Sequence, residues 1–242
     1  MPEALIKRES LPDQIAKILR KEIFTEIYKP GDNLPPEREL ALRFGTSRVT
    51  IRKALGGLEQ EGWIEIVQGR GNTVADFRTT VGLDILPSLM LACPEKFINP
   101  DIFSTIASYS FWMFRDILLS ASAKAVPDDE RLLLELLSRQ VEGIGLAEFW
   151  KNEEAYYAEL LRIGGNIVLR MGYVTYIKMV RNLLEMGAMN EPPYPHDLYH
   201  EINRSLIAAV CSGDQSRVME LMDFYRKDME DAFRRVLEKM PG

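Results

Sequence analysis

The sequence predicts a mainly α protein in two parts: a small N-terminal domain of three helices and a hairpin, then an all-helical bundle. Apolar residues recur every three or four positions through most of the 242 residues, while one short stretch after residue 62 alternates apolar and polar residues. A hydrophobic content of 46% is enough for two modest cores. We therefore expect a first domain at residues 1–76, a linker at 77–81 and a bundle of about six or seven helices at 82–242.

Three short helices are expected before residue 60. The first carries an apolar stripe and ends before Pro30 and Gly31, and the stripe comprises Ile15, Ile18, Leu19 and Ile23. The second opens at the Pro35–Pro36 pair and stops at Gly45. The third begins directly afterwards, where the hydroxyl of Thr46 or Ser47 can cap its free amide groups.

The third helix is predicted to have a basic outer face. The segment "ALRFGTSRVTIRKALGGL", residues 41–58, holds four basic residues and no acidic one, although the whole chain has a net charge of −6. Its apolar stripe faces inward and consists of Ile51, Ala54, Leu55 and Leu58. Val49, Arg52 and Lys53 then face outward, with Arg48 and Thr50 on the flanks. Two helices joined by a tight glycine-containing turn, the second of them basic, are typical of a helix-turn-helix.

A hairpin follows the third helix. The stretch "WIEIVQGRGNTVAD" alternates apolar and polar residues, turns between Gly69 and Asn72, and alternates again. A hairpin in this place is a wing, and its tip at Gln68, Gly69 and Arg70 offers a cation on a slim backbone that can approach a DNA minor groove.

The segment "GDNLPPERELALRFGTSRVTIRKALGGLEQEGWI" resembles the winged-helix domain of the GntR transcriptional regulators, and the likeness covers residues 10–76. The resemblance implies a homodimer that binds pseudo-palindromic double-stranded operator DNA, with Arg38, Arg48 and Arg52 in contact with the DNA. An arginine can take both acceptors of a guanine, whereas Ser47 and Thr50 suit phosphates. The expected DNA-binding set is Arg38, Thr46, Ser47, Arg48, Thr50, Arg52, Lys53, Gln68, Gly69 and Arg70.

The Gly56–Gly57 pair departs from the bulkier residues that the family commonly has inside this helix. Each mid-helix glycine costs about 1 kcal/mol relative to alanine. The pair either loosens the end of the helix or allows a close approach to DNA or to a partner subunit, and the sequence leaves these alternatives open.

The second part reads as six amphipathic helical segments at 101–125, 128–142, 147–166, 167–187, 197–213 and 214–240. The stretches "EAYYAELLRIGGNIVL" and "INRSLIAAVCSGDQSRVMELMDFYRKDM" resemble the effector domain of the FadR branch, which senses carboxylic acids or acyl thioesters. Where most of that branch has an Asp and three His that hold a divalent metal, this chain has Glu153, Tyr157, Asn203 and Tyr225. Because no imidazole remains in this set, we expect no metal and no cofactor.

The stretch "TVADFRTTVGLDILPSL" is similar to the corresponding segment of the fatty-acid-responsive members, which also lack the metal. That resemblance implies a long-chain fatty acid or acyl-CoA as the effector. Another apolar or carboxylic effector, or no small ligand at all, stays open. The expected effector-binding set is Glu153, Tyr157, Asn203, Tyr225, Met229 and Phe233.

The sequence does not favour a disulfide-rich protein, a metal-binding protein, a membrane protein or an enzyme. Cys93 and Cys211 suit neither a disulfide framework nor a zinc knuckle, and no apolar run is long enough to span a membrane, so we expect a cytoplasmic protein. His196 and His200 are the only histidines, and they fit a helix surface better than a metal site. No phosphate-binding loop or nucleophile elbow occurs, so we expect no enzyme.

Overall fold

The computed structural model describes residues 10–67, 71–93, 96, 100–185, 187, 192 and 195–238. The chain divides into two compact units, residues 1–94 and residues 95–242. Helices dominate both units, and the first also holds a two-stranded antiparallel sheet, so the predicted fold class is confirmed.

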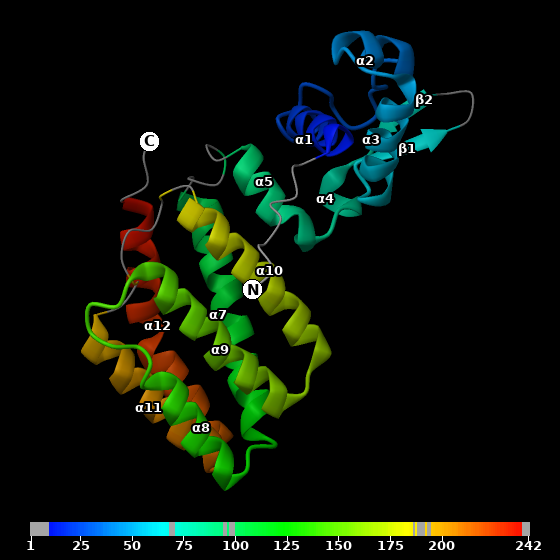
Figure 1. The fold of residues 1–242 in the computed structure, drawn as a ribbon. Helices are drawn as coiled ribbons and strands as arrows, with labels where there is room; N and C mark the ends of the chain where they lie inside the picture. The colour runs from blue at the N-terminus through cyan, green and yellow to red at the C-terminus, as the bar shows by residue number, and fades with distance from the viewer. Residues whose placement is uncertain are drawn as a thin grey trace, which may run out of the picture. The chain divides into compact units, whose positions relative to one another are not determined.

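The first unit begins with the three expected helices (Figure 1), which are α1 (Leu11–Phe24), α2 (Glu37–Arg43) and α3 (Arg48–Gln60). Two antiparallel strands follow, β1 (Ile64–Val67) and β2 (Gly71–Val74), and they pair in register from Ile64 opposite Val74 to Val67 opposite Gly71. This order of three helices and a hairpin is that of a winged helix-turn-helix.

The core of this unit lies between α1, α3 and the hairpin. Trp63 is fully buried at its centre, and the four apolar residues predicted to face inward from α3 are all buried. On α1 one expectation was wrong, because Ile18 is 43% exposed and Ala16 is buried instead. The reason is geometric: a helix turns by about 100° per residue, so a stripe centred between Ile15 and Ile23 includes position 16 and turns position 18 away.

The first compact unit continues past the expected linker. It includes α4 (Phe77–Thr80), a short 3₁₀ helix at Leu83–Ile85, and α5 (Leu86–Ala92), which contacts α1. The ring of Phe77 lies 5.4 Å from that of Trp63 and 5.5 Å from that of Phe24, measured between centroids. Residues 77–80 therefore pack on the winged domain, because an aromatic side chain anchors them there.

The second unit is a helical bundle. Within its described residues it consists of α7 (Pro100–Ser122), α8 (Pro127–Leu137), α9 (Leu146–Gly164), α10 (Ile167–Glu185), α11 (His196–Cys211) and α12 (Gln215–Glu238). The helix α7 contacts α9, α10, α11 and α12, so it forms the centre of the bundle (Figure 1). None of the described helices is both long and apolar enough to cross a membrane.

Candidate functional site

The start of α3 is organised by two hydroxyl groups. Ser47 is the N-cap residue, and its Oγ accepts a hydrogen bond from the backbone N–H of Thr50 at 3.2 Å and lies 3.0 Å from Thr50 Oγ1. This cap fixes the first turn of the helix. Arg48, Arg52 and Lys53 are all exposed on α3, so the structure leaves the three cationic side chains predicted for this helix accessible.

Arg52 is held by an acidic side chain of the preceding helix. Its Nε donates to Glu37 Oε1 at 2.9 Å and its Nη2 donates to Glu37 Oε2 at 2.7 Å. The hydrogen bond from Arg52 is the largest influence on the carboxyl group of Glu37 and lowers its pKa below the usual range. A carboxylate thus stands beside the basic face of α3, which the sequence did not indicate.

The remaining members of the expected DNA-binding set are distributed over α2, the turn and the wing. Arg38 is exposed on α2, and Thr46 is half-buried in the turn, where its N–H donates to the carbonyl oxygen of Ala41. Gln68, Gly69 and Arg70 lie outside the described residues. One exposed apolar residue was absent from the set, since Val49 is 63% exposed in the first turn of α3.

The Gly56–Gly57 pair does not interrupt α3, which runs on to Gln60. A Cβ atom added at either position would meet no heavy atom within 4 Å. No contact inside the described protein therefore requires glycine at these two positions.

A buried carboxyl group marks the interior of the helical unit. Glu153 of α9 is 9% exposed and accepts hydrogen bonds from the hydroxyl of Tyr199 and, at 3.5 Å, from Gln140 Nε2. Burial raises the pKa of Glu153 to about 7, although the two hydrogen bonds act in the opposite direction. No Lys or Arg among the described residues forms an ion pair with it.

Aromatic side chains surround this carboxyl group. Tyr157 of α9 lies with its ring 4.7 Å from that of Phe114 and 5.4 Å from that of Tyr173. The hydroxyl of Tyr173 donates to the backbone oxygen of Glu153 at 3.4 Å. The buried hydroxyl of Tyr156 has no hydrogen-bond partner among the described residues. The interior thus combines a wide aromatic wall with a few polar groups.

The structure brings together part of the expected effector set. Asn203 is buried on α11, and its Nδ2 donates to the backbone oxygen of Tyr199 at 2.9 Å, so it lies one turn from the partner of Glu153. Tyr225 is buried on α12 against the ring of Phe224, and no described contact joins it to Glu153. The side chains of Met229 and Phe233 lie outside the described residues.

The expected effector set did not include five members of this interior. The aromatic residues Phe114, Tyr156 and Tyr173 stand out in the sequence only as part of an aromatic-rich bundle, whereas Gln140 and Tyr199 were missed altogether. Tyr199 could have been found, because it precedes Asn203 by four residues and so shares its helix face. Gln140 carried no comparable signal, since it follows the end of α8 and reaches Glu153 only through the fold.

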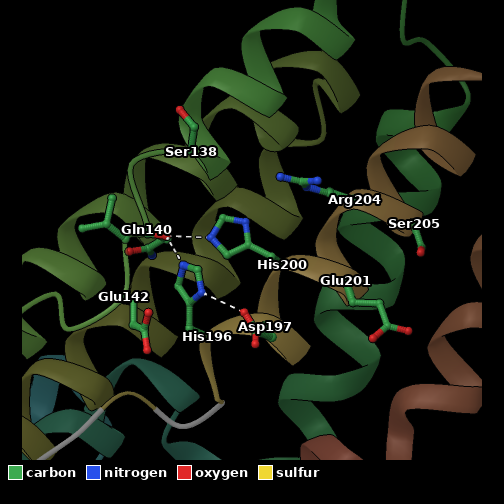
Figure 2. A pocket seen from close by; sticks show the side chains of 10 residues that line it. Ser138, Gln140, Glu142, His196, Asp197, His200, Glu201, Arg204 and Ser205 are labelled. Atoms are coloured by element: carbon green, nitrogen blue, oxygen red, sulfur yellow. Dashed lines mark hydrogen bonds and ion pairs between the residues drawn. The ribbon is translucent and has the colours of Figure 1, made fainter.

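The two histidines line a surface groove of about 760 Å³ between the end of α8 and the start of α11 (Figure 2). The Nε2 atoms of His196 and His200 lie 3.1 and 2.6 Å from the same backbone oxygen, that of Gln140. This arrangement satisfies a carbonyl group just beyond a helix end. No group of three or more His, Cys, Asp or Glu that could hold a metal occurs among the described residues.

The comparison with protein families concerns the first unit. Residues 11–74, which span α1 to β2, match the family described as "Bacterial regulatory proteins, gntR family". Residues 11–74 therefore form a GntR-family DNA-binding domain, and the chain is that of a transcriptional regulator. GntR-family regulators bind operator DNA, and the family is one of regulators rather than enzymes, as the sequence led us to expect.

Relatives of this regulator extend over both units. It is 28% identical over 218 residues to "HTH-type transcriptional regulator Mce2R" of Mycobacterium tuberculosis, with 86% of this chain and 85% of that protein covered. It is 26% identical over 250 residues to a "Fatty acid metabolism regulator protein" of Klebsiella pneumoniae, with 98% and 97% covered. Among solved structures, "Streptococcus agalactiae GntR" is 19% identical with a TM-score of 0.45, covering 91% of this chain and 99% of that one.

Proposed function

We propose that the regulator binds its operator as a homodimer through α3, with Arg48 and Arg52 reading bases and Lys53 contacting phosphates. Support comes from the exposure of all three cations on a helix whose opposite face is buried, and from the family's binding of operator DNA. A two-fold symmetric protein then matches a pseudo-palindromic site.

The proposed effector is a long-chain fatty acid or its acyl-CoA thioester, bound inside the helical unit. The observation that carries this proposal is the relative described as a fatty acid metabolism regulator, because its likeness runs through the helical unit as well as the winged domain. The aromatic wall formed by Phe114, Tyr157 and Tyr173 supports it, since such side chains suit an acyl chain.

A short carboxylic acid or another polar metabolite is the second candidate. The carboxyl group of Glu153 and the hydroxyl of Tyr156, which has no hydrogen-bond partner among the described residues, favour it. Buried polar groups of this kind suit a ligand that returns hydrogen bonds. The acyl candidate therefore depends on the aromatic wall, and the short-acid candidate depends on the buried polar groups of the same interior.

Ligand titration of the full-length dimer tests the proposal. Fatty acids and acyl-CoAs from C8 to C18 should raise the melting temperature in a concentration-dependent way and lower operator affinity. Burial contributes about 0.8 kcal/mol per methylene, so a C16 chain should bind several orders of magnitude more tightly than a C8 chain. Native mass spectrometry of freshly purified protein would reveal a copurified acyl species.

The same titration separates the alternatives. A response to short hydroxy- or dicarboxylic acids with none to the acyl series would replace the acyl proposal by the second candidate. A flat response to both series would leave the helical unit with the single role of dimerising the DNA-binding domains.

A further inference from the structure

One edge of the Arg52 guanidinium is occupied before any DNA is bound. The two atoms Nε and Nη2 donate to the two carboxylate oxygens of Glu37, so both bonds of a side-on bidentate pair are present. Glu37 is the first residue of α2 and Arg52 lies in the second turn of α3, so the pair links the two helices of the helix-turn-helix. No other described group forms a hydrogen bond or an ion pair with this guanidinium.

The pair leaves the other edge of the guanidinium available. Nη1 and the second N–H of Nη2 point away from the edge that Glu37 occupies, because the guanidinium group is planar and its donors form a fixed fork. Two such parallel donors match O6 and N7 of guanine. The side chain of Arg52 is 70% exposed, so this second edge is accessible while the first is held.

We infer that Glu37 is a positioning residue for base reading, which holds Arg52 by one edge so that the other edge meets a guanine of the operator. The inference rests on the proposed function, because it takes Arg52 as a base-reading side chain. An exposed arginine without such a partner samples many rotamers and must be immobilised when it binds. In the free protein the pair with Glu37 already restricts the rotamers of Arg52, so less conformational entropy is lost when Arg52 binds DNA.

Glu37 also acts against DNA of the wrong sequence. Its carboxyl group is ionised at neutral pH, since the ordinary pKa of 4.5 lies far below 7 and the hydrogen bond from Arg52 lowers the pKa further. A negative charge beside the DNA-contacting face repels phosphates of every sequence and so weakens non-specific binding. On the operator this repulsion is offset by the orientation of Arg52, and the ratio of specific to non-specific affinity rises.

Three variants separate orientation from charge. Glu37→Gln keeps the size of the side chain but has one acceptor oxygen, so it cannot accept both bonds from Arg52, and it removes the charge. Glu37→Asp keeps the charge but is one methylene shorter, so it cannot reach Arg52 in the same way. Glu39→Gln is the matched control, since Glu39 is exposed in the first turn of the same helix and its side chain has no hydrogen bond or ion pair among the described residues.

The experiment selects DNA from a random-sequence library with the full-length protein and measures base preference at each position of the selected site. Arg52→Ala should erase a guanine preference at one position of each half-site. Glu37→Gln and Glu37→Asp should lower that same preference by about 3- to 30-fold, the range expected when arginine rotamer freedom is lost only on binding. Glu39→Gln should leave it within about 2-fold of the wild type.

Binding to random DNA gives the second readout. Glu37→Gln and Glu39→Gln should both bind it more tightly, because each removes one negative charge, whereas Glu37→Asp should not. The double variant Glu37→Gln/Arg52→Ala should show the same base preferences as Arg52→Ala, because Glu37 acts through Arg52.

The outcomes distinguish the inference from the function on which it rests. If Arg52→Ala erases a guanine preference that both Glu37 variants retain, Arg52 reads the base and the role of Glu37 is overturned. If Arg52→Ala leaves every preference unchanged, the assignment of Arg52 fails and the positioning role fails with it. A preference that increases in Glu37→Gln would show that the pair withholds Arg52 from DNA, which also overturns the inference.

Discussion

Tyr199 donates a hydrogen bond to the carboxyl group of Glu153, and both side chains are buried inside the helical unit. One residue is on α11 and the other on α9, so the bond connects helices that are 46 residues apart at these positions. A carboxyl group in this setting ties the stability of the unit to pH, because burial raises its pKa to about 7 from an ordinary value of 4.5.

The first prediction is that Glu153→Gln stabilises the protein at pH 8 more than at pH 5. Between pH 4.5 and 7 the unfolded wild type loses the proton while the folded state keeps it, so the free energy of unfolding falls as the pH rises through this window. The amide does not titrate, and the difference between variant and wild type should grow by about 2 to 3 kcal/mol from pH 5 to pH 8. Urea denaturation at the two pH values measures it.

Tyr199→Phe is the companion variant. The lost hydrogen bond had lowered the pKa of Glu153, so this variant should be destabilised more at pH 8 than at pH 5. In a Glu153→Gln background the dependence on pH should disappear. An equal effect of Glu153→Gln at both pH values would show that this carboxyl group titrates normally in the folded protein.

The second prediction concerns the cations of α3. Arg48→Ala and Arg52→Ala should each weaken operator binding by about 5- to 150-fold and relax the base preference at one position, as expected for the loss of a bidentate contact. Lys53→Ala should weaken binding to all sequences similarly and reduce the salt slope by about one. Fluorescence anisotropy on selected and random duplexes at several salt concentrations separates the two patterns. Equal losses on both duplexes for the arginine variants would place the reading face elsewhere.

The third prediction is that the purified regulator holds no stoichiometric metal. Of the four side chains at the positions where most of the branch binds one, Glu153 is engaged by Tyr199 and Asn203 donates to a backbone oxygen. None offers an imidazole nitrogen, which late first-row metals prefer. Elemental analysis after dialysis against a weak chelator tests this. About one zinc, nickel or manganese per subunit would refute it, and loss of that metal in His196→Ala/His200→Ala would assign it to the surface groove.

The fourth prediction contrasts two glycine positions near the end of α3. Gly57→Ala should raise the free energy of unfolding by about 1 kcal/mol, because the added Cβ lies in open space on a regular helix. Gly62→Ala should lower it by about 1 to 2 kcal/mol, because Gly62 has φ of +84° and a Cβ there would lie 2.5 Å from the backbone oxygen of Thr80. Thermal and chemical denaturation measure both changes.

The same glycine variants bear on DNA binding and assembly. If Gly57→Ala stabilises the fold but weakens operator affinity, the Gly56–Gly57 pair serves a close approach to DNA. A weaker dimer at unchanged DNA affinity per dimer would assign the pair to the partner subunit. A destabilised protein would contradict the open space found around this position.

The winged domain was largely predictable because its signals are local. Ser47, one of the two residues expected to cap α3, is its N-cap, and the buried stripe from Ile51 to Leu58 follows from helical periodicity alone. The pairing of Arg52 with Glu37 was not predictable, because it depends on the angle between two helices and on side-chain rotamers. The exposure of Ile18 was also not predictable, because the sequence does not show which residue lies at the centre of a helical stripe until the core has formed.

The interior of the helical unit was less predictable. The resemblance led to Glu153, Tyr157 and Asn203, but periodicity cannot tell a cluster around a carboxyl group from ordinary core. Gln140 and Tyr173 reach Glu153 from other segments of the chain, and only the packing of the bundle brings them together. Contacts of this kind require tertiary structure, whereas the helices themselves do not.

The packing of Phe77 on Trp63 and Phe24 determines where the protein can be cut. A fragment that stops at residue 76 would lack Phe77, uncover aromatic surface, and leave Gly62 without the hydrogen bond that its backbone oxygen accepts from Thr80. A fragment that runs through α5 keeps these contacts and the one between α5 and α1. Chimaeras that exchange effector domains should therefore be joined after residue 93 instead of after the wing, since the earlier junction divides a single core.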